Sequence, residues 1–246
     1  MVATRVPRLP PCAPAFCGRS APPCSANGSW RTMSDVSVII PAFNAAPFVA
    51  LAVASAFAQG PRVREVLVVD DGSTDGTADA ASAAGARVVQ RANGGSGAAR
   101  NTGVAGTGGP YIAFLDADDE WPGGRLALLL GVLESDTALD AVFGEVVEFG
   151  EGRTESQPGA ARLPGSMLIR RAAFERVGPF REDVRVGEFI DWWARAEEAG
   201  LRARNTPGVV LRRRIHATNT GIVHADSRAD YARVLRETLR RRRGAS

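Results

Sequence analysis

The sequence predicts an α/β fold in which a mixed, mostly parallel sheet is flanked by helices, and three observations favour it. From Val36 onward, short apolar runs alternate with helix-like stretches, as expected of βαβ units around a parallel sheet. Polar clusters follow the apolar runs at the points where the strands should stop, which is where open α/β sheets bind ligands. The 246 residues are 45% hydrophobic and 23% charged, which is enough for one domain with a sizeable core.

Four predicted strands account for the first half of the chain. We expect them at residues 36–41, 65–70, 86–91 and 111–116. Pro41 is expected to end the first strand, and a helix at 47–59 begins with a proline, which suits the first helical turn. Ser73 or Thr74 is expected to cap a second helix, and a glycine-rich loop enters a third helix within 94–106.

The second half is less regular. We predict strands at 141–150 and 208–216, a polar loop at 151–165, and a strand that runs into a short helix across 165–180. The stretch 187–200 is amphipathic, because helical spacing places four apolar residues on one face: Phe189, Trp192, Trp193 and Ala196.

Residues 225–246 are predicted to form a basic amphipathic helix and tail. Helical spacing sets Tyr231, Val234, Leu235 and Leu239 on one face, with arginines around the rest. Such a helix can dock on its own domain or lie on an anionic membrane surface, and the sequence leaves both open.

Residues 1–33 are rich in proline, have no hydrophobic period and contain all three cysteines. We expect this segment to be disordered, or absent if translation begins at Met33. The cysteines form neither a disulfide framework through the fold nor a zinc site. No run approaches the roughly 18 apolar residues of a membrane span, and no nucleic-acid-binding module is present. The predicted location is therefore the cytoplasm or the cytoplasmic face of a membrane.

The stretch YIAFLDADDEW, residues 111–121, runs from an apolar segment directly into a group of carboxylates. Packed carboxylates repel one another unless a cation or a proton lies among them. Because hard divalent cations prefer carboxylate oxygens, the cluster indicates either a metal site or a solvated acidic turn.

Six motifs resemble family 2 glycosyltransferases of the GT-A fold. They are VSVIIPAFN, VLVVDDGSTDGT, GGSGAARNTG, IAFLDADDEW, GSMLIRRAAFERVGPF and RRRIHATN, in the family's order. The resemblance implies a GT-A domain at 34–224, with a nucleotide-sugar half at 34–121 and an acceptor half at 122–224. It also implies sugar transfer with inversion from a nucleoside diphosphate sugar, with uridine as the expected base.

The resemblance implies a donor site and a metal site. The nucleotide-sugar residues it implies are Pro41, Ala42, Asn44, Asp70, Asp71, Arg100, Asp116 and Ala117. Asp116, Asp118 and His216 are the implied ligands of Mg²⁺ or Mn²⁺, which would neutralise charge on the leaving diphosphate. For Asp70 and Asp71, capping of the next helix is the alternative to nucleoside contact.

The family usually supplies its catalytic base as the aspartate of a Glu-Asp pair at a helix start. Alignment on Trp193 and Arg195 puts Glu188 on the glutamate but Phe189 on the aspartate. We therefore expect Glu188, or else Asp191 one turn on, to take the proton from the acceptor hydroxyl.

Two other functions remain open at this stage. A non-catalytic binding or scaffold protein would explain Phe189. A nucleotidyltransferase is less favoured, because PAFNAAPF lacks the glycine-rich triphosphate loop. The expected partners are a nucleoside diphosphate sugar and an acceptor from one of four classes: a saccharide, a lipid-linked molecule, a small molecule or a peptide.

Overall fold

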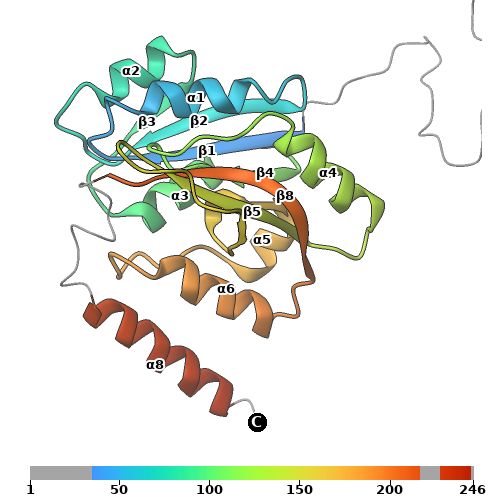
Figure 1. Cartoon of the computed structure of the whole chain (residues 1–246). Coiled ribbons are helices and arrows are strands. Elements are labelled where there is room, and N and C mark those ends of the chain that lie inside the picture. Colours follow the sequence, from blue (N-terminus) through green and yellow to red (C-terminus); the bar gives the residue numbers. More distant parts are fainter. Residues whose placement is uncertain (1–34, 217–227, 245–246) are drawn as a thin grey trace, which may run out of the picture. The chain divides into compact units, whose positions relative to one another are not determined.

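The computed structural model describes residues 35–216 and 228–244. Within them one mixed sheet has the strand order β3-β2-β1-β4-β7-β5-β6, and β8 pairs with β5. The strands are β1 (Val36–Ala42), β2 (Val63–Asp70), β3 (Arg87–Gln90), β4 (Tyr111–Phe114), β5 (Ala141–Phe149), β6 (Gly159–Ala160), β7 (Met167–Arg170) and β8 (Ala203–Arg214). Strands β3, β2, β1 and β4 are parallel, β7 is antiparallel to β4 and β5, and β8 is parallel to β5 (Figure 1). The predicted fold class is confirmed.

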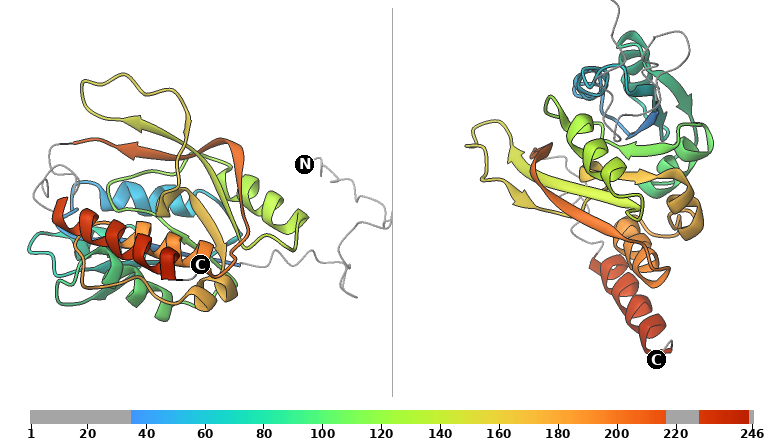
Figure 2. Two further views of the ribbon diagram at one scale, coloured as in Figure 1. Left: turned by 90° about the horizontal axis from the view of Figure 1, so that it is seen from below. Right: turned by 90° about the vertical axis from the view of Figure 1, so that its right-hand side faces the viewer.

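Helices cover both faces of the sheet (Figure 2). They are α1 (Val49–Phe57), α2 (Thr77–Ala83), α3 (Ser96–Ala105), α4 (Arg125–Ser135), α5 (Arg171–Val177), α6 (Glu188–Glu198) and α8 (Arg228–Gly244), with a 3-10 turn at Pro164–Ser166. Alternate residues of β1 point to opposite faces, as the period of a strand requires. Val38 and Ile40 belong to a hydrophobic cluster that includes residues of α1, α2 and α4, whereas Ile39 belongs to a second cluster that includes residues of α5 and α6.

Several boundaries differ from the prediction. Pro41 lies inside β1 and does not end it, because β4 pairs with β1 only as far as Ile39 and no ladder bond is lost there. Helix α1 begins at Val49, after a turn that contains the proline. Helix α2 begins at Thr77, because Ser73 and Thr74 bond to Asn44 and do not cap it. Helix α4 and the short strand β6 were not predicted.

Helix α8 lies along α6 (Figure 1). Of the four apolar residues predicted on one face, Val234 is fully buried, whereas Tyr231, Leu235 and Leu239 are exposed. Ion pairs from Arg233 to Asp183 and from Arg241 to Asp191 fix the rotation of the helix.

No helix within 35–216 and 228–244 is long and apolar enough to cross a membrane. The predicted N-terminal extension 1–33, and the end of the predicted domain at 217–224, lie outside the described residues.

The contact of α3 with β1 depends on Gly103. A Cβ built there would lie 2.2 Å from Cγ2 of the fully buried Ile39. We expect Gly103→Ala to lower the free energy of unfolding by about 1–3 kcal/mol through overpacking. Gly131→Ala in α4 is the control, because a Cβ there meets nothing within 4 Å; it should stabilise by about 0.5–1 kcal/mol. Urea unfolding measures both, and equal effects would contradict the packing argument.

Candidate functional site

The acids of the DADD turn lie directly after β4, at the carboxyl end of the strand. The N–H of Asp119 donates to the carbonyl oxygen of Asp116 at 3.0 Å, which closes a tight turn. On one side of the turn Asp116 meets Arg100 of α3, and on the other Asp118 meets His216 beyond β8. The structure therefore brings Asp118 and His216 together, from segments about a hundred residues apart in sequence, whereas Asp116 faces Arg100.

A buried arginine connects Asp116 to the candidate base. Nη2 of Arg100 donates to Asp116 at 2.6 Å, and Nη1 donates to Glu188 at 2.6 Å. The hydroxyl of Ser96 donates to the same oxygen of Glu188 at 2.7 Å. Burial by itself lowers the pKa of Arg100, but the carboxylates of Asp116 and Glu188 outweigh it, so its pKa is raised. The Arg100 guanidinium thus stays charged and holds both acids.

Asp118 and His216 form a second contact pair. The Nε2 atom of His216 lies 3.0 Å from Oδ2 of Asp118, and the imidazole stacks on Phe48 with ring centroids 4.8 Å apart. Burial raises the pKa of Asp118 and the charge of Asp116 adds to this, while the hydrogen bond with His216 opposes the rise.

Asp119 has a structural task. Its carboxylate accepts the N–H of Arg214 at 2.8 Å, so it holds the end of β8, two residues before His216. Burial, with the charges of Asp116 and Asp118, raises the pKa of Asp119 well above its usual range.

Asp70 and Asp71 are buried, and their carboxylates bond to backbone N–H groups and also meet the side chains of Gln90 and Arg91. Asp71 accepts the N–H groups of Gly94 and Gly95 at 2.7–3.1 Å and so anchors the glycine-rich loop before α3. Asp70 accepts the N–H of Ser73 at 3.0 Å and caps a turn, while α2 begins at Thr77. Neither aspartate caps the following helix.

The remaining candidate donor residues surround the ends of β1 and β4. Pro41, Ala42 and Ala117 are buried, whereas Asn44 is exposed and adopts a positive φ of 48°. The side chain of Asn44 accepts the N–H of Thr74 at 2.9 Å, which joins the loops after β1 and β2. These loops form one edge beside the acid cluster.

The three candidate positions for the base have different surroundings. Glu188, at the first turn of α6, faces Arg100 and Ser96. Phe189 is buried among Phe180, Trp192 and Trp193.

Asp191 is enclosed by positive charge. It pairs with Arg195 at 2.9 Å, with Arg241 at 3.0 Å and with Arg181 at 3.9 Å. Its carboxylate binds α8 to α6, so Glu188 is the acid of this helix that joins the cluster.

The acids fit a divalent cation by their chemistry. Asp116 and Asp118 are crowded carboxylates whose mutual repulsion a cation would relieve, and His216 adds an imidazole that suits Mn²⁺ better than Mg²⁺. Among the described residues no group of three or more His, Cys, Asp or Glu side chains is arranged to hold a metal ion. Magnesium sites often consist of only one or two carboxylates together with substrate phosphates.

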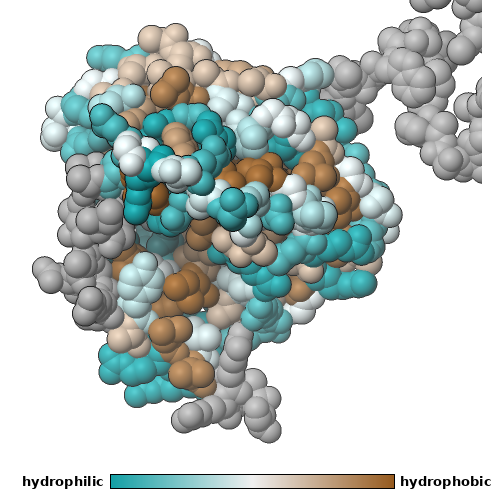
Figure 3. Space-filling view, viewed as in Figure 1, coloured by the Kyte–Doolittle hydropathy of each residue, from teal (hydrophilic) through white to brown (hydrophobic). Residues whose placement is uncertain are grey.

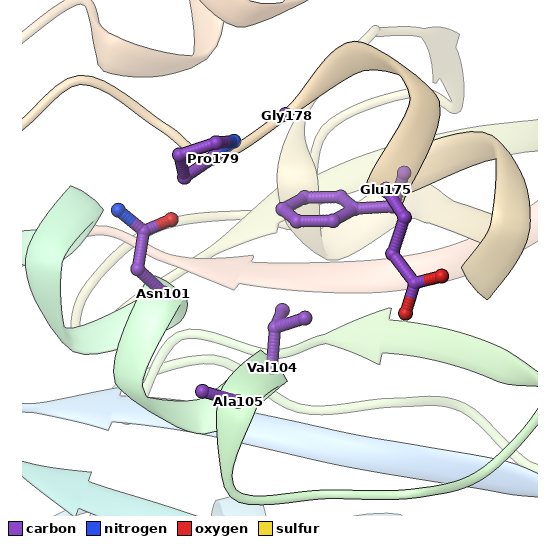
Figure 4. A pocket seen from close by; sticks show the side chains of 7 residues that line it. Asn101, Val104, Ala105, Glu175, Gly178 and Pro179 are labelled. Carbon is purple, nitrogen blue, oxygen red and sulfur yellow. The ribbon is translucent and has the colours of Figure 1, made fainter.

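A pocket of about 300 Å³ lies elsewhere, between α3 and α5 (Figure 4). The residues that line it are Asn101, Val104, Ala105, Phe174, Glu175, Gly178 and Pro179. None of these belongs to the acid cluster, and most of the wall is apolar. The pocket is therefore no part of the candidate donor site.

The sequence analysis missed Ser96 and Phe48. Ser96 lies inside the quoted glycine-rich motif, so its position was available, but its contact with Glu188 spans 92 residues. Phe48 carries no motif, and its stacking on His216 appears only in three dimensions.

Comparisons with known proteins give one consistent result. The family model described as "Glycosyl transferase family 2" matches residues 37–185, a match that ends just before Glu188. The succinoglycan biosynthesis protein ExoU of Rhizobium meliloti is 37% identical over 202 residues, 69% of this chain and 58% of that protein. The glycosyltransferase AglE of Haloferax volcanii is 30% identical over 198 residues, 69% of this chain and 63% of that protein.

Among solved structures, residues 1–349 of S. aureus TarS in complex with UDP-GlcNAc superpose with a TM-score of 0.66 at 20% identity. The match covers 76% of this chain and 60% of that one. This likeness supports the GT-A fold. The chain spans less than two thirds of the length of these relatives.

Phe189 is part of the aromatic core, so its position is not a solvent-accessible site where a catalytic base could simply be restored. Replacing a buried Phe by Ala typically lowers the free energy of unfolding by about 3–5 kcal/mol. We expect Phe189→Asp to lower it by more, because this change also buries a carboxylate. Phe57→Asp is the control, because Phe57 is 42% exposed, and it should change stability little. Urea unfolding compares the two. A stable Phe189→Asp protein would contradict this assignment.

Proposed function

This chain belongs to glycosyl transferase family 2, and we propose that it transfers a sugar from a nucleoside diphosphate donor to an acceptor hydroxyl with inversion. We propose uridine as the base of the donor. The cytoplasm is the proposed location, because all three cysteines precede the domain and none staples it. The acceptor class remains open among saccharides, lipid-linked molecules, small molecules and peptides.

One observation carries the proposal: Arg100 binds both Asp116 of the acid cluster and Glu188 of α6 at 2.6 Å. A transferase needs a charge-stabilising site for the leaving diphosphate and a base for the acceptor close to each other. Here a single guanidinium lies between the two candidates.

The donor site is proposed at the carboxyl ends of β1, β2 and β4. Asp116 and Asp118, with His216, would hold Mg²⁺ or Mn²⁺, which supplies Lewis-acid stabilisation of charge on the diphosphate.

The loop of Pro41, Ala42 and Asn44 borders the proposed nucleoside pocket. Asp70 and Asp71 support that pocket and keep acceptor capacity beyond their backbone bonds for a nucleoside hydroxyl. Ala117 allows the donor to approach the turn.

Glu188 is the proposed general base. As the acceptor oxygen bonds to the anomeric carbon, the bond from that carbon to the diphosphate oxygen breaks, and the acceptor proton passes to the Glu188 carboxylate. Ser96 and Arg100 donate to one oxygen of this carboxylate and orient it. Phe189 packs in the aromatic cluster, and the proposal therefore places the base at Glu188.

Metal-dependent nucleotide binding tests the donor site. We expect UDP to bind in calorimetry with Mn²⁺ and to bind at least about tenfold more weakly without it, a loss of about 1.4 kcal/mol. Asp118→Asn should show the same loss in the presence of Mn²⁺, because a carboxylate ligand is removed. Asp79→Asn, an exposed acid on α2, is the control and should bind as the wild type does. Equal UDP affinity with and without metal, or in Asp118→Asn, would refute the site.

Glu188→Gln and Asp191→Asn separate the two candidate bases. Glu188→Gln should lower kcat for hydrolysis or transfer of a UDP-sugar by about 10²–10⁴-fold, with UDP affinity unchanged. Asp191→Asn should lower stability by weakening its pairs with arginines on α6 and α8, yet keep kcat within about threefold in the folded protein. Kinetics on protein shown to be folded measure both. Loss of kcat in Asp191→Asn alone would transfer the role to Asp191.

A further inference from the structure

Helix α8 docks through ion pairs that surround one fully buried apolar residue, Val234. Its ion pairs with the domain are Arg233–Asp183 at 3.2 Å, Glu237–Arg181 at 2.5 Å, and Arg241 with Asp191 at 3.0 Å and Glu198 at 3.3 Å. Asp230 accepts the N–H of Arg185 at 3.0 Å. Both acids of this helix among residues 230–241, Asp230 and Glu237, therefore bond to the domain. This arrangement is unusual, because a surface helix ordinarily packs its apolar face against the domain.

The outward side of α8 carries an apolar stripe made of Tyr231, Leu235 and Leu239. These residues are four apart, so they line up along one face, and they are 40%, 50% and 54% exposed. Figure 3 shows apolar side chains on the surface over α8, with more over α6 beside it. A stripe of this kind on a soluble surface indicates an interaction site.

The charge beside the stripe identifies its partner. Arg236 and Arg240 are exposed next to Leu235 and Leu239. Among residues 230–241, whose side chains the structure describes, the outward positions include no acid. A face with apolar side chains and only positive charge complements an anionic lipid surface. In a symmetric dimer formed through this face, the arginines of one copy would meet the same face of the other copy. Within residues 230–241 the outward side of the helix offers no acid there to pair with them.

We propose that the stripe and its two arginines are a docking surface for anionic membranes. The stripe begins next to the candidate base, because the ring of Tyr231 comes within 3.4 Å of a Cβ built on Gly187, the residue before Glu188. A membrane bound on the stripe therefore runs past the start of α6. This inference does not depend on the proposed transfer reaction, since it requires neither donor nor metal.

Flotation of the full chain with lipid vesicles tests the proposal. We expect the protein to float with vesicles of phosphatidylcholine containing about one third phosphatidylglycerol, and not with phosphatidylcholine alone. Binding should fall when ionic strength rises from about 0.1 M to about 1 M, because salt screens the arginines. Failure to bind the anionic vesicles, or equal binding to both kinds, would overturn the proposal.

Matched variants locate the surface. Leu239→Glu should weaken binding by about tenfold or more, whereas Leu51→Glu, on α1 and 52% exposed, should not. The double variant Arg236→Gln/Arg240→Gln should weaken vesicle binding about 30-fold, which is about fivefold for each charge removed. The control double variant Arg64→Gln/Arg202→Gln removes the same charge elsewhere on the surface and should have little effect. Equal losses in the paired variants would overturn the assignment. Light scattering that shows a dimer lost in Leu239→Glu would assign the stripe to a second copy instead.

Discussion

The buried guanidinium of Arg100 is the interaction on which the arrangement of the site depends. An arginine inside a protein is costly unless carboxylates pair with it, and removal of one partner leaves an uncompensated charge. Asp116 comes from the end of β4 and Glu188 from the start of α6, so the pairing fixes α3, β4 and α6 relative to one another. The segments that precede and follow the DADD turn therefore meet at one positive charge.

The position of Arg100 depends in turn on the glycine-rich loop. Asp71 accepts the N–H groups of Gly94 and Gly95, which sets the start of α3 one turn before the arginine. Gly97 lets α3 approach the segment before α6, because a Cβ there would lie 2.7 Å from the carbonyl oxygen of Arg181. Arg181 also pairs with Glu237 of α8, so the helix with the exposed stripe supports the same segment that precedes Glu188.

Sequence patterns predicted what local periodicity controls. The alternation of strands and helices and the aromatic face of α6 follow from such periods, whereas the DADD turn was found from its clustered carboxylates. Helix α4 escaped prediction because its stretch RLALLLGVLES is apolar almost all round and shows no clear face. The rotation of α8 also escaped, because its partners Asp183 and Asp191 lie 50 residues away in sequence. Local pattern contains no information about such distant ion pairs.

Helix geometry explains why the acid in the cluster is Glu188. Successive residues of an α-helix are rotated by about 100°. The aromatic face with Phe189 and Trp192 packs against the sheet, so an aspartate at 189 would point into apolar side chains. Residue 191 lies near the direction of residue 188, but the arginines that bind α8 enclose it. The family's motif would place an aspartate at position 189, but the periodicity of α6 directs that position into the apolar core. The carboxylate of α6 that contacts Arg100 is therefore at position 188.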